Sequence, residues 1–358
     1  MKSLKILDWP QNRFYSETHP FHRWSGQLKE NGIKVEFYFD HTDKKLRDAD
    51  YLIIHSRYFE DGWQNTIKRT VENEEELIRF LIGVKKTIGK LIWFDAADST
   101  GSNDFAIIEF VDTFLKKQTL KNTDYYSEGK NLRIWLDSND FEKTLSAFKP
   151  CPKDQLYKIK VGWNIGLNDY RPYGYKLTRL SNYLSYNIYP SRFSVVNKER
   201  KYDLIFRGTT HNSNSLAQAI SFQRNKVISM FDTLNFNILR GNPVSKNIYW
   251  KELRNSKVSI SPFGWGEICY RDFETLISGA VLIKPSMEHL QTYPNIYIPN
   301  ETYIPVDWNL NDLEEKLEVL LNNYASFKHI AENAQELYKT NINNAELFVD
   351  CVKRMINY

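Results

Sequence analysis

Residues 258–285 read VSISPFGWGEICYRDFETLISGAVLIKP and decide the fold of this chain. The first residues, Val258–Ile260, form a short β-type run that stops at Pro262. Gly264 and Gly266 follow and are typical of a tight turn. The stretch therefore opens with a strand that enters a glycine-rich turn.

A helix and a second strand follow this turn. The helical spacing of apolar residues over 273–277 predicts a helix that ends at Gly279, a residue type common at helix C-termini. The apolar run Ala280–Ile283 then predicts a buried strand. The order strand, turn, helix and strand is typical of a parallel α/β sheet.

The turn offers a place for an anionic ligand. The N-terminus of a helix after a glycine turn presents free backbone N–H groups and a positive dipole end, which suits a diphosphate. Arg271 adds a forked donor for phosphate oxygens, and Glu267 and Glu274 can share one helical face. Carboxylates at such a place commonly accept hydrogen bonds from ribose hydroxyls. The alternative is a capped surface helix in which Glu267 only favours the dipole.

This stretch resembles the donor-binding segment of GT-B glycosyltransferases. The resemblance rests on residues 263–267 (FGWGE), on Glu274 and on the small residues 278–280 (SGA). Six residues separate Glu267 from Glu274, whereas seven separate the two glutamates of the retaining branch. Residues 271–280, RDFETLISGA, also resemble the exostosin-type and bacterial polysaccharide branches of the superfamily.

The resemblance implies an α/β protein of GT-B type, with two Rossmann-like domains that face each other across a cleft. We expect an acceptor domain over 1–195, a donor domain over 196–340, and a terminal helix over 341–358 that crosses back to the first domain. Arg207 resembles the basic residue near the donor diphosphate, and Arg207, Arg271 and Lys284 are our candidates for offsetting leaving-group charge. We expect neither a metal nor another cofactor. The expected donor-binding residues are Arg207, Gly208, Thr209, Gly264, Gly266, Glu267, Tyr270, Arg271, Glu274 and Lys284.

The composition is that of a globular protein without an extreme charge. The chain has 358 residues, 42% of them hydrophobic and 15% aromatic, which is enough for two domains with their own cores. The net charge of +4 is too small to argue for nucleic acid, so we expect no nucleic-acid partner. It is compatible with a nucleotide diphosphate and with a peripheral contact at an anionic membrane.

The three cysteines, Cys151, Cys269 and Cys351, are far apart and match neither a metal site nor a disulfide framework. The N-terminus lacks the apolar core of a signal peptide, and no apolar run approaches the roughly 20 residues of a membrane span. These features predict a cytoplasmic protein that reaches any lipid-linked acceptor from the inner face of the membrane.

In the first half, strands alternate with helical segments, which predicts a Rossmann-like domain. Polar groups that follow its strands should open onto the cleft, where an acceptor and a catalytic base belong. The alternative is that an aspartate caps the following segment, Asn103–Phe114, for which we expect a helix. We interpret 150–197 as the interdomain connection and Ile296–Pro299 as a strand. The catalytic candidates are Asp98, Asp95, His19 and His22.

The sequence thus predicts a metal-independent transferase that moves a sugar from a nucleotide-diphosphate sugar to a glycan or lipid-linked acceptor, as in bacterial surface polysaccharide synthesis. Two alternatives stay open. A non-hydrolysing sugar-nucleotide epimerase shares the architecture and needs a histidine near the diphosphate, for which His211 is the candidate. The other is a non-catalytic nucleotide- or carbohydrate-binding protein.

Overall fold

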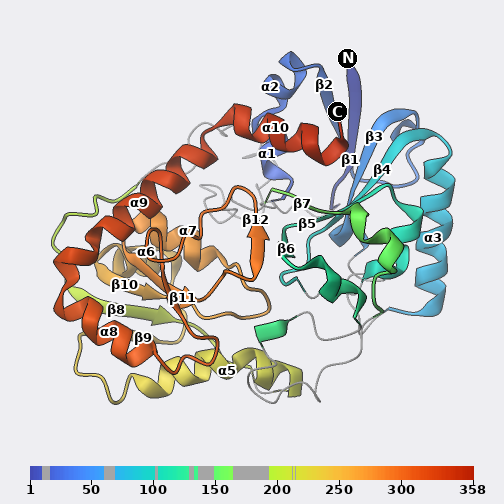
Figure 1. Ribbon diagram of the computed structural model, residues 1–358. Helices are drawn as coiled ribbons and strands as arrows, with labels where there is room; N and C mark the ends of the chain where they lie inside the picture. The colour runs from blue at the N-terminus through green and yellow to red at the C-terminus, as the bar shows by residue number, and fades with distance from the viewer. Residues whose placement is uncertain are drawn as a thin grey trace.

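The computed structural model describes residues 1–9, 17–59, 69–100, 104–128, 133–135, 149–163, 193–211, 213 and 215–358 (Figure 1). Most of the connection that we expect over 150–197 lies outside these residues. The described residues form two parallel sheets, and a two-stranded antiparallel ribbon lies between them.

The first half is built on a six-stranded parallel sheet with the order β2-β1-β3-β4-β5-β7. The central strands are almost entirely buried, as expected when helices cover both faces of a parallel sheet. Helix α3 begins with a capping box between Thr70 and Asn73, which satisfies two backbone N–H groups. The elements are β1 (Lys2–Leu7), α1 (His19–Arg23), α2 (Ser25–Glu30), β2 (Ile33–Tyr38), β3 (Ala49–His55), α3 (Val71–Lys85), β4 (Ile88–Asp95), β5 (Thr113–Lys116) and β7 (Ile159–Val161).

The second half is built on a five-stranded parallel sheet with the order β13-β11-β10-β8-β9. Helix α7 ends at Gly279, which has a left-handed backbone (φ +62°) as predicted. The two sheets and their helices confirm the prediction of an α/β fold. The elements are β8 (Tyr202–Arg207), α5 (Ser215–Met230), β9 (Ile238–Gly241), α6 (Lys246–Arg254), β10 (Ser256–Ile260), α7 (Tyr270–Ser278), β11 (Val281–Pro285), β13 (Ile304–Val306), α8 (Leu313–Asn322) and α9 (Tyr324–Ile342).

Two features join the halves. Strand β6 (Gln118–Leu120) of the first half pairs antiparallel with β12 (Leu290–Thr292) of the second. The last helix, α10 (Ala345–Ile356), follows α9 and lies beside α2 and β5 of the first half (Figure 1). There the ring of Phe348 packs edge-on against Phe21 at 5.1 Å. The C-terminus therefore returns to the first sheet after the second sheet is complete.

Two expected elements differ from the structure. The segment Asn103–Phe114 is not an α-helix over its described residues, because a 3₁₀ helix, η4 (Asp104–Phe110), is followed by strand β5. Ile296–Pro299 is not a strand, since Pro299 makes only an isolated bridge to Tyr303 and the sheet takes Ile304–Val306 instead. In both cases the apolar residues are buried as expected, but the pairing partner decides the conformation.

The loop before β12 holds a histidine whose protonation opposes folding. Both ring nitrogens of His289 are buried, and the backbone of Ser286 is a weak hydrogen-bond partner of the ring. The ring packs against Trp308 at 4.9 Å and lies 6.2 Å from Phe263. Burial lowers the pKa of His289 to about 4, against the opposing charge of Glu267.

We therefore expect His289 to destabilise the fold in acid. A histidine with a depressed pKa contributes stability above its unfolded pKa of about 6.5, and this contribution is lost as the pH falls towards 4. The loss amounts to at most about 3 kcal/mol. Urea unfolding of the wild type and of His289→Asn at pH 7 and pH 4.5 should show a difference in stability that shrinks on acidification. Parallel pH profiles for the two proteins would contradict this role.

Candidate donor-binding site

A pocket of about 270 Å³ opens in the second half where β8 ends and α7 begins. Four of the expected donor-binding residues line it, namely Arg207, Tyr270, Arg271 and Glu274. The last three come from the first turns of α7, where residues three and four positions apart share a face. The remaining lining residues are Arg224, Pro243, Val244, Lys246, Tyr249 and Cys269.

Two of the arginines crowd each other in this pocket. The guanidinium of Arg271 donates to the Arg207 carbonyl and lies over the Phe206 ring, while that of Arg224 donates to the Thr209 carbonyl at 3.0 Å. Burial and the neighbouring charge of Arg271 lower the pKa of Arg224. The Nε atoms of both residues are buried and have no partner among the described residues. An anion between these two guanidinium groups would relieve their repulsion.

Arg224 was not predicted from the sequence, because it lies within helix α5 without a local motif. Its position does explain Gly264. A Cβ atom at Gly264 would clash with an Arg224 guanidinium nitrogen, so any larger residue there would displace the arginine from its present position. The predicted glycine thus admits a basic side chain to the pocket wall.

Arg207 differs from these two arginines because its charge is already paired. Its Nε and Nη2 donate to the two carboxylate oxygens of Glu252 at 2.9 and 2.7 Å, a bidentate ion pair. This ion pair holds Arg207 at the edge of the pocket. Because its charge is already neutralised by Glu252, Arg207 would attract a diphosphate less strongly than Arg224 or Arg271 would.

Glu274 lies deeper on α7 and is almost entirely buried. The Lys246 amine donates to one of its oxygens at 3.2 Å. Burial and the charge of Glu274 raise the pKa of Tyr249 well above its usual value, so that phenol keeps its proton beside the carboxylate. The pocket therefore places a carboxylate and a phenol on the wall next to the arginine pair.

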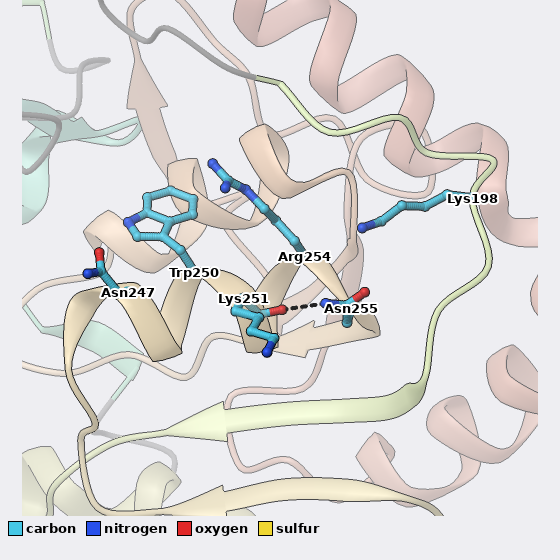
Figure 2. A pocket seen from close by; sticks show the side chains of 6 residues that line it. All are labelled: Lys198, Asn247, Trp250, Lys251, Arg254 and Asn255. Atoms are coloured by element: carbon cyan, nitrogen blue, oxygen red, sulfur yellow. Dashed lines mark hydrogen bonds between the residues drawn. The ribbon is translucent and has the colours of Figure 1, made fainter.

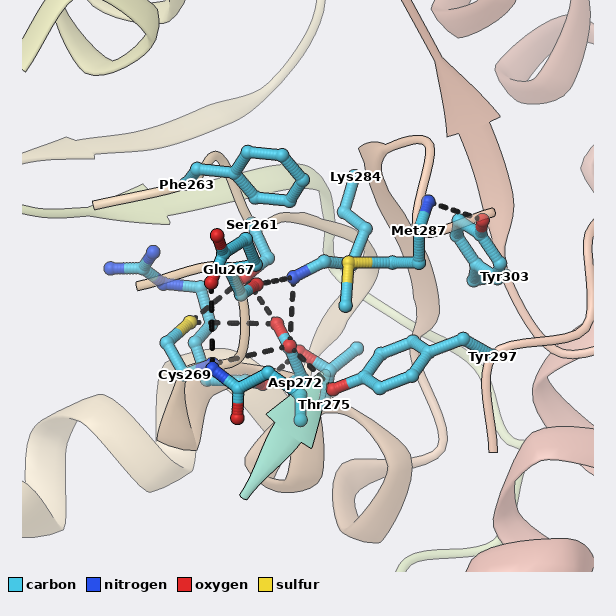
Figure 3. Close-up of polar contacts among 12 residues, drawn as sticks. Ser261, Phe263, Glu267, Cys269, Asp272, Thr275, Lys284, Met287, Tyr297 and Tyr303 are labelled. Carbon is cyan, nitrogen blue, oxygen red and sulfur yellow. Dashed lines mark hydrogen bonds and ion pairs between the residues drawn. The ribbon is translucent and has the colours of Figure 1, made fainter. Parts of the chain in front are cut away.

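Lys284 does not reach the pocket. It is fully buried, and its amine donates to the Asp272 carboxylate at 2.8 Å and to the Glu267 carbonyl at 2.7 Å (Figure 3). Asp272 also accepts hydrogen bonds from Tyr297 and Ser261. These contacts make Lys284 part of a structural cluster below the start of α7, so we withdraw it as a phosphate-binding candidate.

Glu267 and Gly266 join the two halves instead of lining the pocket. The Glu267 carboxylate accepts from the hydroxyls of Ser99 and Thr100 at 2.9 and 3.0 Å. A Cβ atom at Gly266 would come within 1.8 Å of the Asp98 carbonyl oxygen. The glycine turn is therefore the point at which the second half touches the loop after β4. The donor-binding hypothesis for Glu267 and Gly266 does not fit this placement.

Gly208 and Thr209 follow β8 but do not line the pocket. Gly208 lies against the ring of Phe206, and the Thr209 carbonyl is used by Arg224. Their described contacts are with protein groups, so neither enters the site that we propose.

Three of the four catalytic candidates are buried in the first half. Asp95 forms an ion pair with Lys116, and each of these side chains is only 1% exposed. The ring of His22 stacks on Phe37 at 3.5 Å, and burial lowers the pKa of His19 well below its usual value. Asp95 is already neutralised by Lys116, and none of Asp95, His19 and His22 lines the donor pocket, so their placement does not support the catalytic hypothesis for these three residues.

Asp98 is placed differently, since 53% of its side chain is exposed. Its carboxylate lies 3.0 Å from Arg57 and 3.6 Å from Lys117. Its backbone touches Gly266, two residues from the Gly264 that touches Arg224. Two Cα steps span at most about 7 Å, so one short turn separates Asp98 from the arginine pair.

The sequence did not reveal Glu17 as part of this network. Its buried carboxylate lies 3.2 Å from Lys117 and 4.0 Å from His55. Burial alone would raise the pKa of Glu17, but the charge of Lys117 and the contact with His55 hold it far below its usual range. Lys117 thus lies between a buried carboxylate and the exposed Asp98.

The pocket and the two-sheet architecture can be set beside solved structures. An alpha-glucosyltransferase in complex with UDP-glucose and DNA containing an abasic site is similar over 100% of both chains, with a TM-score of 0.50 and 10% identity. This chain has the GT-B fold. A DNA-modifying beta-glucosyltransferase is similar with a TM-score of 0.49 and 12% identity over 99% of this chain and 100% of its own. The T4 phage beta-glucosyltransferase has a TM-score of 0.46 at 12% identity, over 99% and 100% of the two chains.

No protein-family model matches the GT-B chain, and neither does any curated protein. The expectation of a glycan or lipid-linked acceptor and no nucleic-acid partner is contradicted, because the similar alpha-glucosyltransferase structure is a complex with UDP-glucose and DNA. The error has a physical reason. A small net charge does not describe how the charges are distributed over the surface.

None of the helices in the described residues combines the length and apolar character that a membrane span requires. In the same part of the chain, no group of three His, Cys, Asp or Glu side chains is arranged as a metal site.

Proposed function

We propose that this GT-B protein is a glycosyltransferase that moves a sugar from a nucleotide-diphosphate sugar to a hydroxyl group of a nucleic acid. The observation that carries the proposal is the arginine pair. Arg224 and Arg271 face one pocket at the start of α7, and burial and the charge of Arg271 lower the pKa of Arg224. The negative charge of a nucleoside diphosphate would favour the charged form of Arg224.

Each part of the donor has a matching group in this pocket. The diphosphate would lie between Arg224 and Arg271 at the positive end of the α7 dipole. The ribose hydroxyls would donate to the Glu274 carboxylate, which lies one turn further along the same helix. During transfer the two arginines would stabilise the charge that develops on the leaving diphosphate.

The acceptor class follows from the fold likeness and is part of the proposal. The similar alpha-glucosyltransferase holds DNA together with UDP-glucose. Asp98, exposed at the turn that borders the pocket, is the group that would take the proton of the acceptor hydroxyl. The epimerase alternative loses its support, because His211 does not line the pocket. The exostosin-type branch and a cytoplasmic location remain predictions from the sequence.

The function can be tested by following UDP release from UDP-glucose with and without duplex DNA that carries hydroxyl-bearing bases. A transferase of this kind should release UDP and label the DNA only when both substrates are present. An epimerase would interconvert nucleotide sugars without DNA, and a binding protein would do neither. Either of those results would overturn the proposal.

Glu274→Gln should weaken UDP binding about tenfold or more. The substitution keeps the size of the side chain but removes the charge, and a hydrogen bond to a charged group is worth about 1.5–3 kcal/mol. Isothermal titration with UDP measures the change. Glu318→Gln, on the exposed side of α8, is the matched control and should bind UDP like the wild type. Unchanged UDP affinity in a folded Glu274→Gln protein would contradict the proposal that Glu274 binds the ribose.

A further inference from the structure

A second cavity, of about 450 Å³, lies on another face of helix α6 (Figure 2). Its wall consists of the side chains of Lys198, Asn247, Trp250, Lys251, Arg254 and Asn255. Five of these six residues come from α6 or from the residue that ends it, and Lys198 reaches in from the segment before β8 (Figure 2).

The two pockets use different faces of α6. Lys246 and Tyr249 line the donor pocket, whereas Asn247, Lys251 and Arg254 line the second cavity. Positions 247, 251 and 254 follow the i, i+4, i+7 spacing of one helical face, about a third of a turn away from 246 and 249. The same short helix therefore serves two separate cavities.

The second cavity is basic, and no carboxylate lines it. In the described part of the chain none of its three cations forms an ion pair, and the Nε of Arg254 is buried without a hydrogen-bond partner. Arg207 and Lys257 of the same half, by contrast, form ion pairs with Glu252 and Asp203. The positive charges of Lys198, Lys251 and Arg254 are therefore not neutralised by carboxylates in the wall of the cavity.

The cations around this cavity repel one another, and this repulsion disfavours the charged form of Lys198. Burial and the charges of Arg200 and Arg254 lower the pKa of Lys198. Arg200 is tied up by backbone carbonyls, among them those of Ser256 and Ser278, so it raises the local potential without being available to a ligand. The guanidinium of Arg254 lies 5.3 Å from the Trp250 ring, which limits its movement. A bound anion would relieve this repulsion.

We propose that this basic face of α6, formed by Lys198, Lys251 and Arg254, binds backbone phosphates of the nucleic-acid acceptor. The inference rests on the proposed acceptor class. Lysine, arginine and asparagine side chains are the usual donors to DNA phosphates. From position 247 to 254 the face rises about 10 Å along the helix, a length over which duplex DNA carries about six charges. A duplex therefore presents several phosphates to this face at once.

The decisive variant is Lys198→Gln/Lys251→Gln/Arg254→Gln, measured by fluorescence anisotropy with labelled duplex DNA between 50 and 200 mM salt. Each lost phosphate contact should lower the slope of log affinity against log salt by about one, so the expected change is about three. The affinity at 100 mM salt should fall at least about tenfold. Lys44→Gln/Lys45→Gln, exposed on the first half, is the control for net charge and should change the slope little.

Other readouts separate this inference from the proposed function. UDP affinity should be unchanged in the triple variant, since none of its residues lines the donor pocket. Lys251→Gln alone, at an exposed position, should change the slope by about one and serves if the triple variant does not fold. If the wild type binds UDP and DNA but the variants keep its salt slope, only this inference is overturned. An equal loss in the control, or no DNA binding by the wild type, would also overturn it.

Two further arms identify another source of the anion. Thermal stabilisation of the wild type, but not of the triple variant, by millimolar inorganic phosphate with unchanged DNA affinity would assign the cavity to a small anion. Loss of binding to vesicles with anionic lipids, again with unchanged DNA affinity, would assign it to a membrane. Both outcomes would overturn the proposal.

Discussion

Replacing Asp98 by asparagine is expected to lower the turnover of sugar transfer by roughly 10²–10⁴, because the acceptor hydroxyl then loses its base. The substitution keeps the size of the side chain and one acceptor oxygen, but the amide cannot take up a proton. UDP affinity should stay close to that of the wild type, since Asp98 lies on the other side of the glycine turn from the donor pocket. Initial rates of UDP release at saturating UDP-glucose and DNA measure the effect.

The competing explanation is that Asp98 only pairs with Arg57 and Lys117 at the surface of the first half. Exposed ion pairs are worth at most about 1 kcal/mol, so this role would leave turnover near normal. Asp154→Asn, at an exposed position on the same half, controls for the loss of one negative charge. Turnover within a few-fold of the wild type in Asp98→Asn would leave the acceptor base to be sought elsewhere.

Replacing Lys284 by methionine should lower the free energy of unfolding by about 3–5 kcal/mol. Lys284 and Asp272 are both 0% exposed, so the substitution leaves a carboxylate buried without its cation. The hydroxyls of Ser261 and Tyr297 remain as partners of Asp272 but carry no compensating charge. Urea unfolding at pH 7 measures the loss, and the α7 end of the donor pocket should loosen with it.

Lys339→Met, exposed on α9, is the matched control and should change stability by less than about 0.5 kcal/mol. Replacing both partners, Lys284→Met with Asp272→Asn, should recover part of the loss because no charge is then left unpaired. A Lys284→Met protein as stable as the wild type but unable to bind UDP would contradict the structural role. It would return Lys284 to the phosphate site.

The sequence by itself determined the parts of this protein that depend on neighbouring residues. Apolar runs predicted strands β10 and β11, because a strand covered on both faces must be apolar along its length. Helical spacing and Gly279 predicted α7 and its left-handed end. Arg271 and Glu274 reached the same pocket for this local reason, since residues three apart on one helix share a face.

Only the tertiary structure decided which charged groups are available to a ligand. The sequence predicted Glu267 as a donor-site carboxylate. In the structure its carboxylate instead accepts hydrogen bonds from Ser99 and Thr100 of the other half. The sequence predicted Lys284 and Asp95 as residues of the cleft. In the structure both are buried in ion pairs, Lys284 with Asp272 and Asp95 with Lys116. Arg224 had no motif and is placed in the pocket by the packing of α5 against the glycine turn.

The physical reason is the range of the interactions. Periodicity, capping and turn formation depend on residues a few positions apart, so they can be predicted from the sequence. Ion pairing and desolvation depend on distances between segments, and the hydroxyls that bind Glu267 lie 168 and 167 residues away in sequence. A buried charge is stable only beside a partner, so whether a carboxylate or amine is structural or free for a substrate is settled when the two sheets come together.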